Sequence, residues 1–264
     1  MNNSTSDRQS ATAKATPTVA SGLDPHDPDH VELARRKLEF TSDARPTFVT
    51  TVGVQYGVVG DKVVPLWNMY AGSFFRCREK DGFLETRSTG FLFRTHPETD
   101  EVLSTLVNPF NGASLEVVHF KTGIVLRKLS KAGWGGALTL DQESEPTTEP
   151  RISISMLSGN DVWVQRDFRT PNINVYELVV FQGHVSDVVA PDIASAPCRI
   201  IAHNVSGWYP WMKMGDAPGS VMARMVGRKV FNIGDMNSRF LEFLRAQQPQ
   251  AFDDPLGVLG DFEN

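Results

Sequence analysis

Apolar and polar residues alternate along most of the chain between residues 46 and 231, with the two-residue period of a β-strand. Short turn sequences such as VGDK, EKDG and NPFNG interrupt the alternation. The pattern predicts eleven strands, at about 46–58, 63–77, 82–94, 101–107, 114–128, 136–141, 151–157, 161–168, 174–185, 198–206 and 220–231. Because short turns join them and no helices intervene, the strands are predicted to form an antiparallel meander.

Two segments have a helical pattern instead. Residues 29–39 form a short amphipathic segment that follows an aspartate suited to cap a helix. Near the C-terminus, Asp235 is the predicted N-cap of a second helix, which Pro249 ends. The apolar face of this second helix is predicted to contain Met236, Phe240, Leu241 and Leu244.

A sheet of about ten antiparallel strands rarely stays flat, and it usually curls into a barrel or folds into a sandwich. We therefore predict a mainly β protein, an antiparallel β-barrel that is lipocalin-like or allene-oxide-cyclase-like, with one helix at each end of the chain. The predicted domain spans residues 26–250, between a disordered tail at 1–25 and a loosely packed tail at 251–264. A barrel of this size encloses room for one small ligand.

Composition narrows the class of function. The net charge is −5 and the only basic run, at 34–37, is interpreted as the solvated face of a helix, so nucleic-acid binding is not expected. No segment has the length and apolar character of a membrane span or a secretory signal. Cys77 and Cys198, the only cysteines, do not form a disulfide framework. A cytoplasmic protein is predicted, and a homodimer is compatible with the sequence.

Three ionisable residues lie on apolar strand faces and are candidate catalytic groups. Glu177 shares its face with Val175 and Val179, so burial would raise its pKa towards the range useful for proton transfer. His119 and His203 also alternate with aliphatic residues, and histidine suits general acid/base catalysis. The alternatives are a glutamate that pairs with a neighbouring arginine or is exposed on an edge strand, and histidines that are structural and partly buried.

Candidate substrate-binding residues lie on the neighbouring strands. Arg166 shares its strand face with Val162 and Val164 and is suited to hold an anionic or carbonyl group of a ligand. A surface Arg–Asp pair is an equal alternative. Trp163 and Tyr176 are further candidates. The histidines at 119, 184 and 203 lack metal-site spacing, and no nucleophile elbow or phosphate loop is present, so no metal and no cofactor are predicted.

One segment, GWYPWMKMGDAPG at 207–219, concentrates bulky side chains where neither period is present. Two prolines prevent a long regular element, so we predict a connection that folds over one end of the barrel. Its large side chains either plug the core or line the mouth of a ligand pocket. The pocket-lining candidates in this segment are Trp208, Tyr209, Trp211, Met212 and Met214.

The same segment resembles the signature of a known family. Residues 207–230 are similar to its W-x-P-W-M-x-M-G-x-x-P-G motif and following strand, VYELVVF resembles its tyrosine–glutamate strand, and LVNPFNGASLEVVHF resembles its hairpin. Val107 stands where the family often has tryptophan, and Phe110 and Asn111 interrupt its usual Pro-x-Thr-Gly. The chain is thus similar, from about 63 to 250, to the domain-of-unknown-function family 1838. Many members carry a twin-arginine export signal, which this sequence lacks.

These observations favour a cofactor-independent isomerase, cyclase or lyase that acts on a hydrophobic small molecule, such as a polyketide, terpenoid or aromatic secondary metabolite. The first alternative is a non-catalytic barrel that binds the same kind of ligand. A metal-dependent hydrolase or oxygenase is a second alternative.

Overall fold

A computed structural model describes residues 22–130, 133–139, 151–170 and 175–262. The side chains of residues 129–139, 168 and 170 lie outside this description. Most of the predicted tail at 1–25 is also outside it, but Leu23, within that range, is buried in the core.

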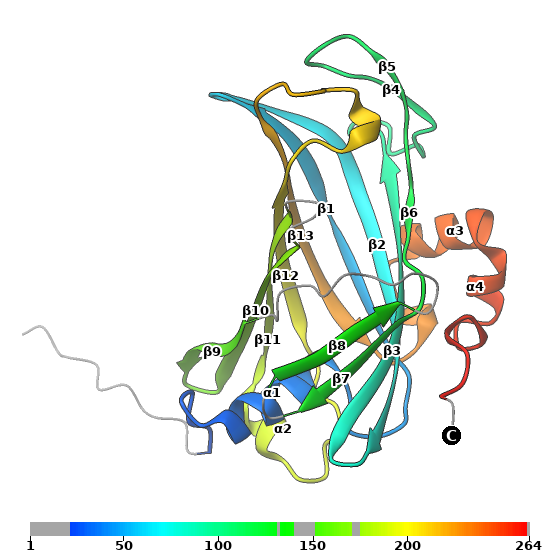
Figure 1. Ribbon diagram of the computed structural model, residues 1–264. Helices are drawn as coiled ribbons and strands as arrows, with labels where there is room; N and C mark the ends of the chain where they lie inside the picture. Colours follow the sequence, from blue (N-terminus) through cyan, green and yellow to red (C-terminus); the bar gives the residue numbers. More distant parts are fainter. Residues whose placement is uncertain (1–21, 131–132, 140–150, 171–174, 263–264) are drawn as a thin grey trace, which may run out of the picture.

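An antiparallel sheet of eleven strands forms the body of the molecule (Figure 1). Its strands are paired in the order β8-β7-β3-β2-β1-β13-β12-β11-β10-β9, and β6 adds to β3. The thirteen strands of the described chain, two of which form a separate hairpin, are β1 (Thr47–Val59), β2 (Lys62–Lys80), β3 (Phe83–Thr95), β4 (Thr105–Val107), β5 (Ser114–Glu116), β6 (Phe120–Lys121), β7 (Val125–Ser130), β8 (Gly133–Thr139), β9 (Arg151–Ser158), β10 (Asp161–Thr170), β11 (Val175–His184), β12 (Arg199–Ser206) and β13 (Ser220–Val230).

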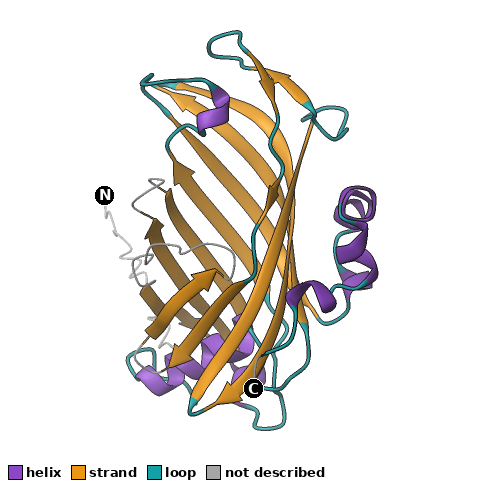
Figure 2. Cartoon of the chain, turned by 45° about the vertical axis from the view of Figure 1, so that its right-hand side comes forward, coloured by secondary structure: helices purple, strands orange, loops and turns teal. Residues whose placement is uncertain are grey.

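The antiparallel, mainly β class predicted from the alternation is confirmed. Two predicted strands differ. The segment 101–107 is reduced to β4, and the segment 114–128 is divided among β5, β6 and β7. The division has a topological reason, because β5 pairs with β4 in a separate hairpin, whereas β6 and β7 pair with β3. The sheet curls strongly (Figure 2), and the strand pairings of the described residues run from β8 to β9 without joining these two edges.

Helix α1 (Pro28–Glu39) lies at one end of the curled sheet, beside the short helix α2 (Val185–Val189) (Figure 1). The predicted aspartate cap is Asp27, whose side chain accepts a hydrogen bond from the Asp29 N–H. Leu38 of α1 packs with Val179 and Ile200 in the main interior core. A methyl group at Gly183 would collide with Leu38, so glycine is needed for this close approach of helix and strand.

The basic run of α1 differs from its predicted role as a solvated face. Arg35, Lys37 and Glu39 are all buried, at 3–6% exposure. The reason is that the curled sheet surrounds the helix, so its polar side chains must find partners inside the protein. Lys229 of β13 completes this junction, because its buried Nζ donates to the Lys37 and Phe40 carbonyls and to Ser195 Oγ. Burial lowers the pKa of Lys229 to about 8.

The convex side of β1, β2 and β3 is covered by α3 (Ser238–Gln247) and α4 (Pro249–Asp253) (Figure 1). The predicted N-cap at Asp235 is wrong: the side chain of Asn237 accepts from the Phe240 N–H, and Asp235 ends a preceding 3-10 turn. Phe240 and Leu244 are fully buried as predicted. Phe243, which was not predicted, joins them in the same cluster.

The C-terminal segment is packed more firmly than predicted. Ala251 and Leu259 are both at most 2% exposed and belong to the core cluster beneath α3. Arg87 of β3 donates from Nε to the Leu259 carbonyl at 2.7 Å and from Nη1 to the Asp261 carbonyl. These hydrogen bonds from the Arg87 guanidinium fix the C-terminal segment on the sheet. The spacing of apolar residues in the sequence does not predict such contacts.

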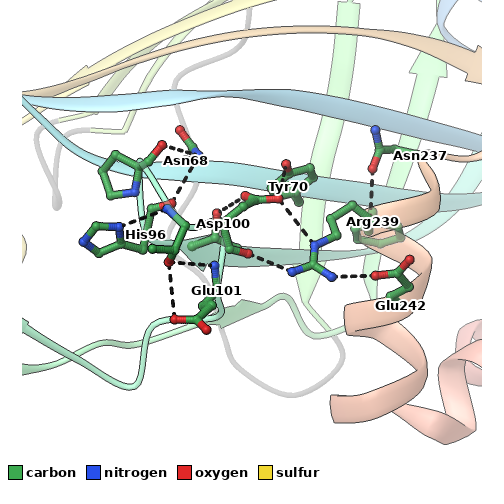
Figure 3. A network of polar contacts seen from close by, with 12 residues as sticks. Asn68, Tyr70, His96, Asp100, Glu101, Asn237, Arg239 and Glu242 are labelled. Atoms are coloured by element: carbon green, nitrogen blue, oxygen red, sulfur yellow. Dashed lines mark hydrogen bonds and ion pairs between the residues drawn. The ribbon is translucent and has the colours of Figure 1, made fainter.

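A polar network joins α3 to the turn between β3 and β4 (Figure 3). Asp100 accepts hydrogen bonds from Tyr70 at 2.9 Å and from Thr95 at 2.7 Å. Arg239 of α3 lies 3.4 Å from the same carboxylate, donates to the Asp100 carbonyl and pairs with Glu242. Every group of this network has partners and lies near the surface, so its evident role is to fix the turn against the helix.

Candidate functional site

The concave side of the sheet contains a cavity of about 210 Å³ beside the C-terminal end of α1. An enclosed apolar cavity of about 150 Å³ already binds benzene, so the volume suits a molecule of roughly one or two rings. Its walls come from α1 and from six strands. The lining residues are Glu39, Val49, Thr51, Ser73, Phe75, Arg166, Glu177, Val179, Phe181, Ile200, Ala202, His203, Asn204, Ala223 and Met225.

Three charged groups meet at this cavity. Arg166 of β10 pairs closely with Glu39 of α1 through Nη1, and its Nη2 lies 3.6 Å from Glu177 Oε1. A separation of 3.6 Å is an ion pair but not a hydrogen bond. Among the described residues, Arg166 therefore contacts Glu39 more closely than Glu177, and the contact of Glu177 with Arg166 is a loose ion pair.

The position of Glu177 makes its carboxyl chemically unusual. Burial raises the pKa of Glu177, and the charge of Glu39 adds to this, while the charges of Arg166 and Arg127 oppose it. The side chain still has 28% of its surface accessible, because it faces the cavity. A carboxyl that is largely buried, still accessible from the cavity and raised in pKa is suited to give or take a proton.

Glu39 is fixed from both sides. Its carboxylate accepts from Arg35 Nε at 3.2 Å, one turn earlier on α1, and pairs with Arg166 across the gap to β10. Its side chain is 4% exposed. The end of α1 thus delivers a second carboxylate to the cavity wall, held in place by two guanidinium groups.

Asn204 is the residue directly across from Glu177 in the pairing of β12 with β11. Residues paired in this way share a face of the sheet and have Cβ atoms about 5 Å apart. The Oδ1 atom of Asn204 is buried and has no hydrogen-bond partner in the described part of the chain. The amide of Asn204 is therefore part of the same cavity wall as the loosely paired carboxyl of Glu177.

The predicted catalytic trio is not brought together. His203 borders the cavity, but it is paired with Leu178, whereas the adjacent Asn204 is paired with Glu177. Since neighbouring residues of a strand point to opposite faces, the imidazole of His203 projects away from the face that carries Glu177.

His119 lies in another part of the molecule. Its Nδ1 accepts from the Arg94 N–H at 3.1 Å, and its ring is 6.0 Å from that of Phe93, centroid to centroid. Phe93 belongs to the convex-side cluster beneath α3. Burial, and then the charge of Arg94, lower the pKa of His119. Because β3 separates it from the cavity, His119 cannot share a ligand with Glu177 in this arrangement.

The predicted substrate-binding residues are also divided. Arg166 is in the cavity wall, as the alternation with Val162 and Val164 indicated. Trp163 and Tyr176 occupy the alternate positions on β10 and β11, and therefore lie on the opposite face of the sheet. Tyr176 is 39% exposed there.

The segment 207–219 folds over the end of the sheet remote from α1 (Figure 1). Met212 is fully buried, and the other four candidates, Trp208, Tyr209, Trp211 and Met214, pack around it in one cluster. None of the five lines the cavity beside Glu177. Of the two predicted roles, this arrangement supports a plug of the core and not the mouth of a ligand pocket.

Polar contacts and ring stacking hold this cover. Tyr209 OH accepts from Gln55 Nε2 at 2.7 Å, and Gln55 Oε1 accepts from Trp67 Nε1. The Arg94 guanidinium lies 5.4–5.7 Å from the ring centroids of Trp67, Tyr209 and Trp211. Asn108 of the predicted NPFNG hairpin donates to the Met212 carbonyl. The hairpin and the signature segment thus form one structural unit.

A second hollow, of about 230 Å³, lies beside the β4–β5 hairpin and contains none of the predicted site residues. In the described part of the chain, no three histidine, cysteine or acidic residues are arranged to hold a metal ion. Across the same residues, no helix is long and apolar enough to span a membrane.

Comparison with known proteins now places the chain. The family described as "Protein of unknown function (DUF1838)" matches residues 45–257. The chain belongs to the DUF1838 family. A search of the curated proteins gives no match to this DUF1838 protein. The match covers every strand of the sheet and α3, but it ends before Leu259 and leaves α1 outside.

Two polar residues of the candidate site, Glu39 and Asn204, were not predicted from the sequence. Glu39 was not singled out, although its i,i+4 spacing from Arg35 is compatible with an ion pair between the two side chains. Asn204 shares its strand face with Ile200 and Ala202. It is therefore a polar residue on an apolar face, the same pattern that identified Glu177. The emphasis on histidine drew attention to its neighbour His203 instead.

Proposed function

We propose that this DUF1838 protein is a cofactor-independent enzyme, an isomerase, cyclase or lyase, that acts on a hydrophobic small molecule in the concave cavity. The observation that carries the proposal is Glu177, an accessible carboxyl of raised pKa that faces a largely apolar space. Such placement of an ionisable group is costly and is concentrated at functional sites. In this proposal the curled sheet acts as a barrel-like container for the substrate, within the cytoplasm.

Each charged residue has a distinct role. Glu177 is the proton donor or acceptor, because it combines an accessible carboxyl with a raised pKa and a loose ion pair. Arg166 and Glu39 position it, since their close pair fixes the guanidinium that faces Glu177. Val179, Phe181 and the other aliphatic walls exclude water and hold the apolar body of the substrate.

The test is a substrate screen in which binding and turnover are read separately. Small ketones, polyenes and hydroxylated aromatics are first selected for binding by thermal shift. The selected compounds are then incubated with the protein in D₂O and followed by NMR and mass spectrometry for isomerisation, ring closure, elimination or deuterium uptake. We expect Glu177→Gln to retain binding and to lose turnover by about 10²–10⁴-fold, the usual contribution of a general acid or base.

Glu242→Gln is the matched control, because Glu242 lies on α3 and pairs with Arg239 outside the sheet. This variant should turn substrate over at the wild-type rate. Equal turnover by wild type and Glu177→Gln would contradict the assignment of Glu177.

A non-catalytic binding barrel is the second candidate. One observation favours it: His119 lies away from the cavity, and His203 borders it from the strand position opposite in face to Glu177, so among the described residues the other carboxyl that faces the cavity is the tightly paired Glu39. A carrier predicts that every selected compound is recovered unchanged from the wild-type protein and that Glu177→Gln alters only affinity.

A further inference from the structure

We propose that Asn204 and Glu177 together form a binding site for one oxygen atom, the carbonyl oxygen of a ketone or enone and its enolate form. The inference deepens the proposed function and rests on it only in taking the concave cavity as the ligand site. It names a specificity residue, Asn204, and a substrate class that the fold alone does not give.

The first support is the juxtaposition of the two side chains. Glu177 and Asn204 are direct partners in the antiparallel pairing of β11 and β12, and both border the cavity. Their Cβ atoms therefore lie about 5 Å apart on one face, close enough for both head groups to reach a single ligand atom.

The second support is that the amide of Asn204 has capacity for a ligand. Its Oδ1 is buried and has no hydrogen-bond partner in the described part of the chain. The oxygen and nitrogen of an amide differ only in their assignment from hydrogen bonding, so either end can face the cavity. A buried polar group without a partner is unusual in a folded protein and points to a missing ligand or water.

The third support is the state of the carboxyl. Burial favours the neutral form of Glu177, and a neutral carboxylic acid donates a hydrogen bond. A protonated acid beside a second donor is a known way to stabilise an oxyanion in an apolar site. Arg166 does not replace either donor, because its Nη1 is committed to Glu39 and its Nη2 is 3.6 Å from Glu177.

These features select a class of ligand. The oxygen that enters the site must accept two hydrogen bonds and be joined to an apolar body that fits about 210 Å³. Ketones and enones meet these conditions, and their enolates accept the same two bonds more strongly because the charge is on oxygen. Hydrocarbons fit the apolar walls but accept no hydrogen bond from Glu177 or Asn204. Ethers accept only weak ones, because they cannot develop charge on oxygen.

Phenols are suitable probes because their ring bears an oxygen on an sp² carbon and becomes an enolate-like anion. We would titrate the full chain with 4-nitrophenol and with 4-nitroanisole, which differ by one methyl group on that oxygen, and obtain each Kd by calorimetry. The wild type is expected to prefer 4-nitrophenol by about tenfold or more, the value of one good hydrogen bond. Affinity should also rise from 4-methylphenol to phenol to 4-nitrophenol, in order of acidity.

Asn204→Leu should reduce the preference for 4-nitrophenol to about threefold or less, while 4-nitroanisole binds as before. Asn204→Ser, a smaller polar replacement, serves if the leucine variant does not fold. Gln182→Leu is the matched control, since Gln182 is an amide on the opposite face of β11 and should leave the preference unchanged.

Equal affinity of the wild type for the two probes, or no binding of either at millimolar concentration, overturns the oxygen site. An unchanged preference in Asn204→Leu overturns the role of Asn204. These failures are distinct from failure of the proposed function, because that function is judged by loss of turnover in Glu177→Gln. An intact phenol preference with no turnover of any compound would leave the oxygen site in a binding protein.

Discussion

Two clusters of carboxylates and arginines in this molecule use the same chemical groups in opposite ways. On the concave side, Arg166 lies between Glu39 and Glu177 in a cavity wall. On the convex side, Arg239 lies between Asp100 and Glu242 at the edge of α3 (Figure 3). Each cluster joins a helix to the sheet, but only the first borders the concave cavity.

The difference lies in hydrogen bonding to the carboxyl. Burial alone would raise the pKa of Asp100, but hydrogen bonds from Thr95, Tyr70 and Asn68 and the charge of Arg239 outweigh it and lower the pKa. For Glu177 no hydrogen bond from a described residue offsets burial, and burial outweighs the charges of Arg166 and Arg127, so its pKa is raised. A satisfied carboxylate is a structural tie, whereas an unsatisfied one beside a cavity is available for chemistry.

The largest expected effect separates the two arginines. Arg166→Met removes one of the two guanidinium groups that pair with Glu39, whose side chain is only 4% exposed. It should therefore lower the free energy of unfolding by about 3 kcal/mol. Arg239→Met removes a pair whose side chains are 38% and 34% exposed, and it should lower the free energy of unfolding far less, because exposed ion pairs contribute little. Urea denaturation followed by circular dichroism measures both.

Equal losses in the two methionine variants would show that burial does not distinguish the clusters. Salt provides a check on the same comparison. The contribution of Arg239 should fall as ionic strength rises, and that of Arg166 should change little, because enclosed pairs are poorly screened.

The sequence predicted one cluster better than the other, for physical reasons. Strand alternation placed Glu177 and Arg166 on apolar faces, because a period of two determines the face of every residue in a strand. It could not show that β10 and β11 meet the end of α1, since Glu39 is more than 120 residues away along the chain. His203 was misplaced as a partner of Glu177 because pairing register, and not alternation within one strand, decides which residues face each other.

The convex network was not predicted at all. Asp100 lies in a turn, at φ 58°, and its partners come from β2, β3 and α3. Neither turn composition nor helical periodicity carries information on such contacts. The same holds for the C-terminal segment, whose carbonyls are fixed by Arg87.

A smaller effect is expected from removing one polar group in each cluster. Tyr70→Phe deletes the hydroxyl that donates to Asp100 at 2.9 Å and should cost about 1 kcal/mol in free energy of unfolding at pH 7. Glu177→Gln should cost nothing or stabilise the fold, because it removes a buried carboxyl that has only a loose ion pair. Thermal and urea unfolding at one pH give both values. A clear loss in Glu177→Gln would mean that its ion pair with Arg166 outweighs burial.

The smallest expected effect is a difference in pH dependence, which has opposite sign for the two carboxyls. The folded-state pKa of Glu177 is raised, so between its unfolded and folded pKa values the unfolded chain binds fewer protons, and stability falls as pH rises. The folded-state pKa of Asp100 is lowered, so stability is lost as pH falls through the acidic range. Glu177→Gln should therefore flatten the decline above the ordinary glutamate pKa, and Asp100→Asn should flatten the loss on acidification.

Asparagine tolerates the left-handed backbone at position 100, so the second variant tests the charge and not the turn. Unfolding free energies measured from acidic to neutral pH for wild type and both variants decide the matter, and parallel curves for wild type and Glu177→Gln would mean that Glu177 is ionised like an ordinary surface glutamate.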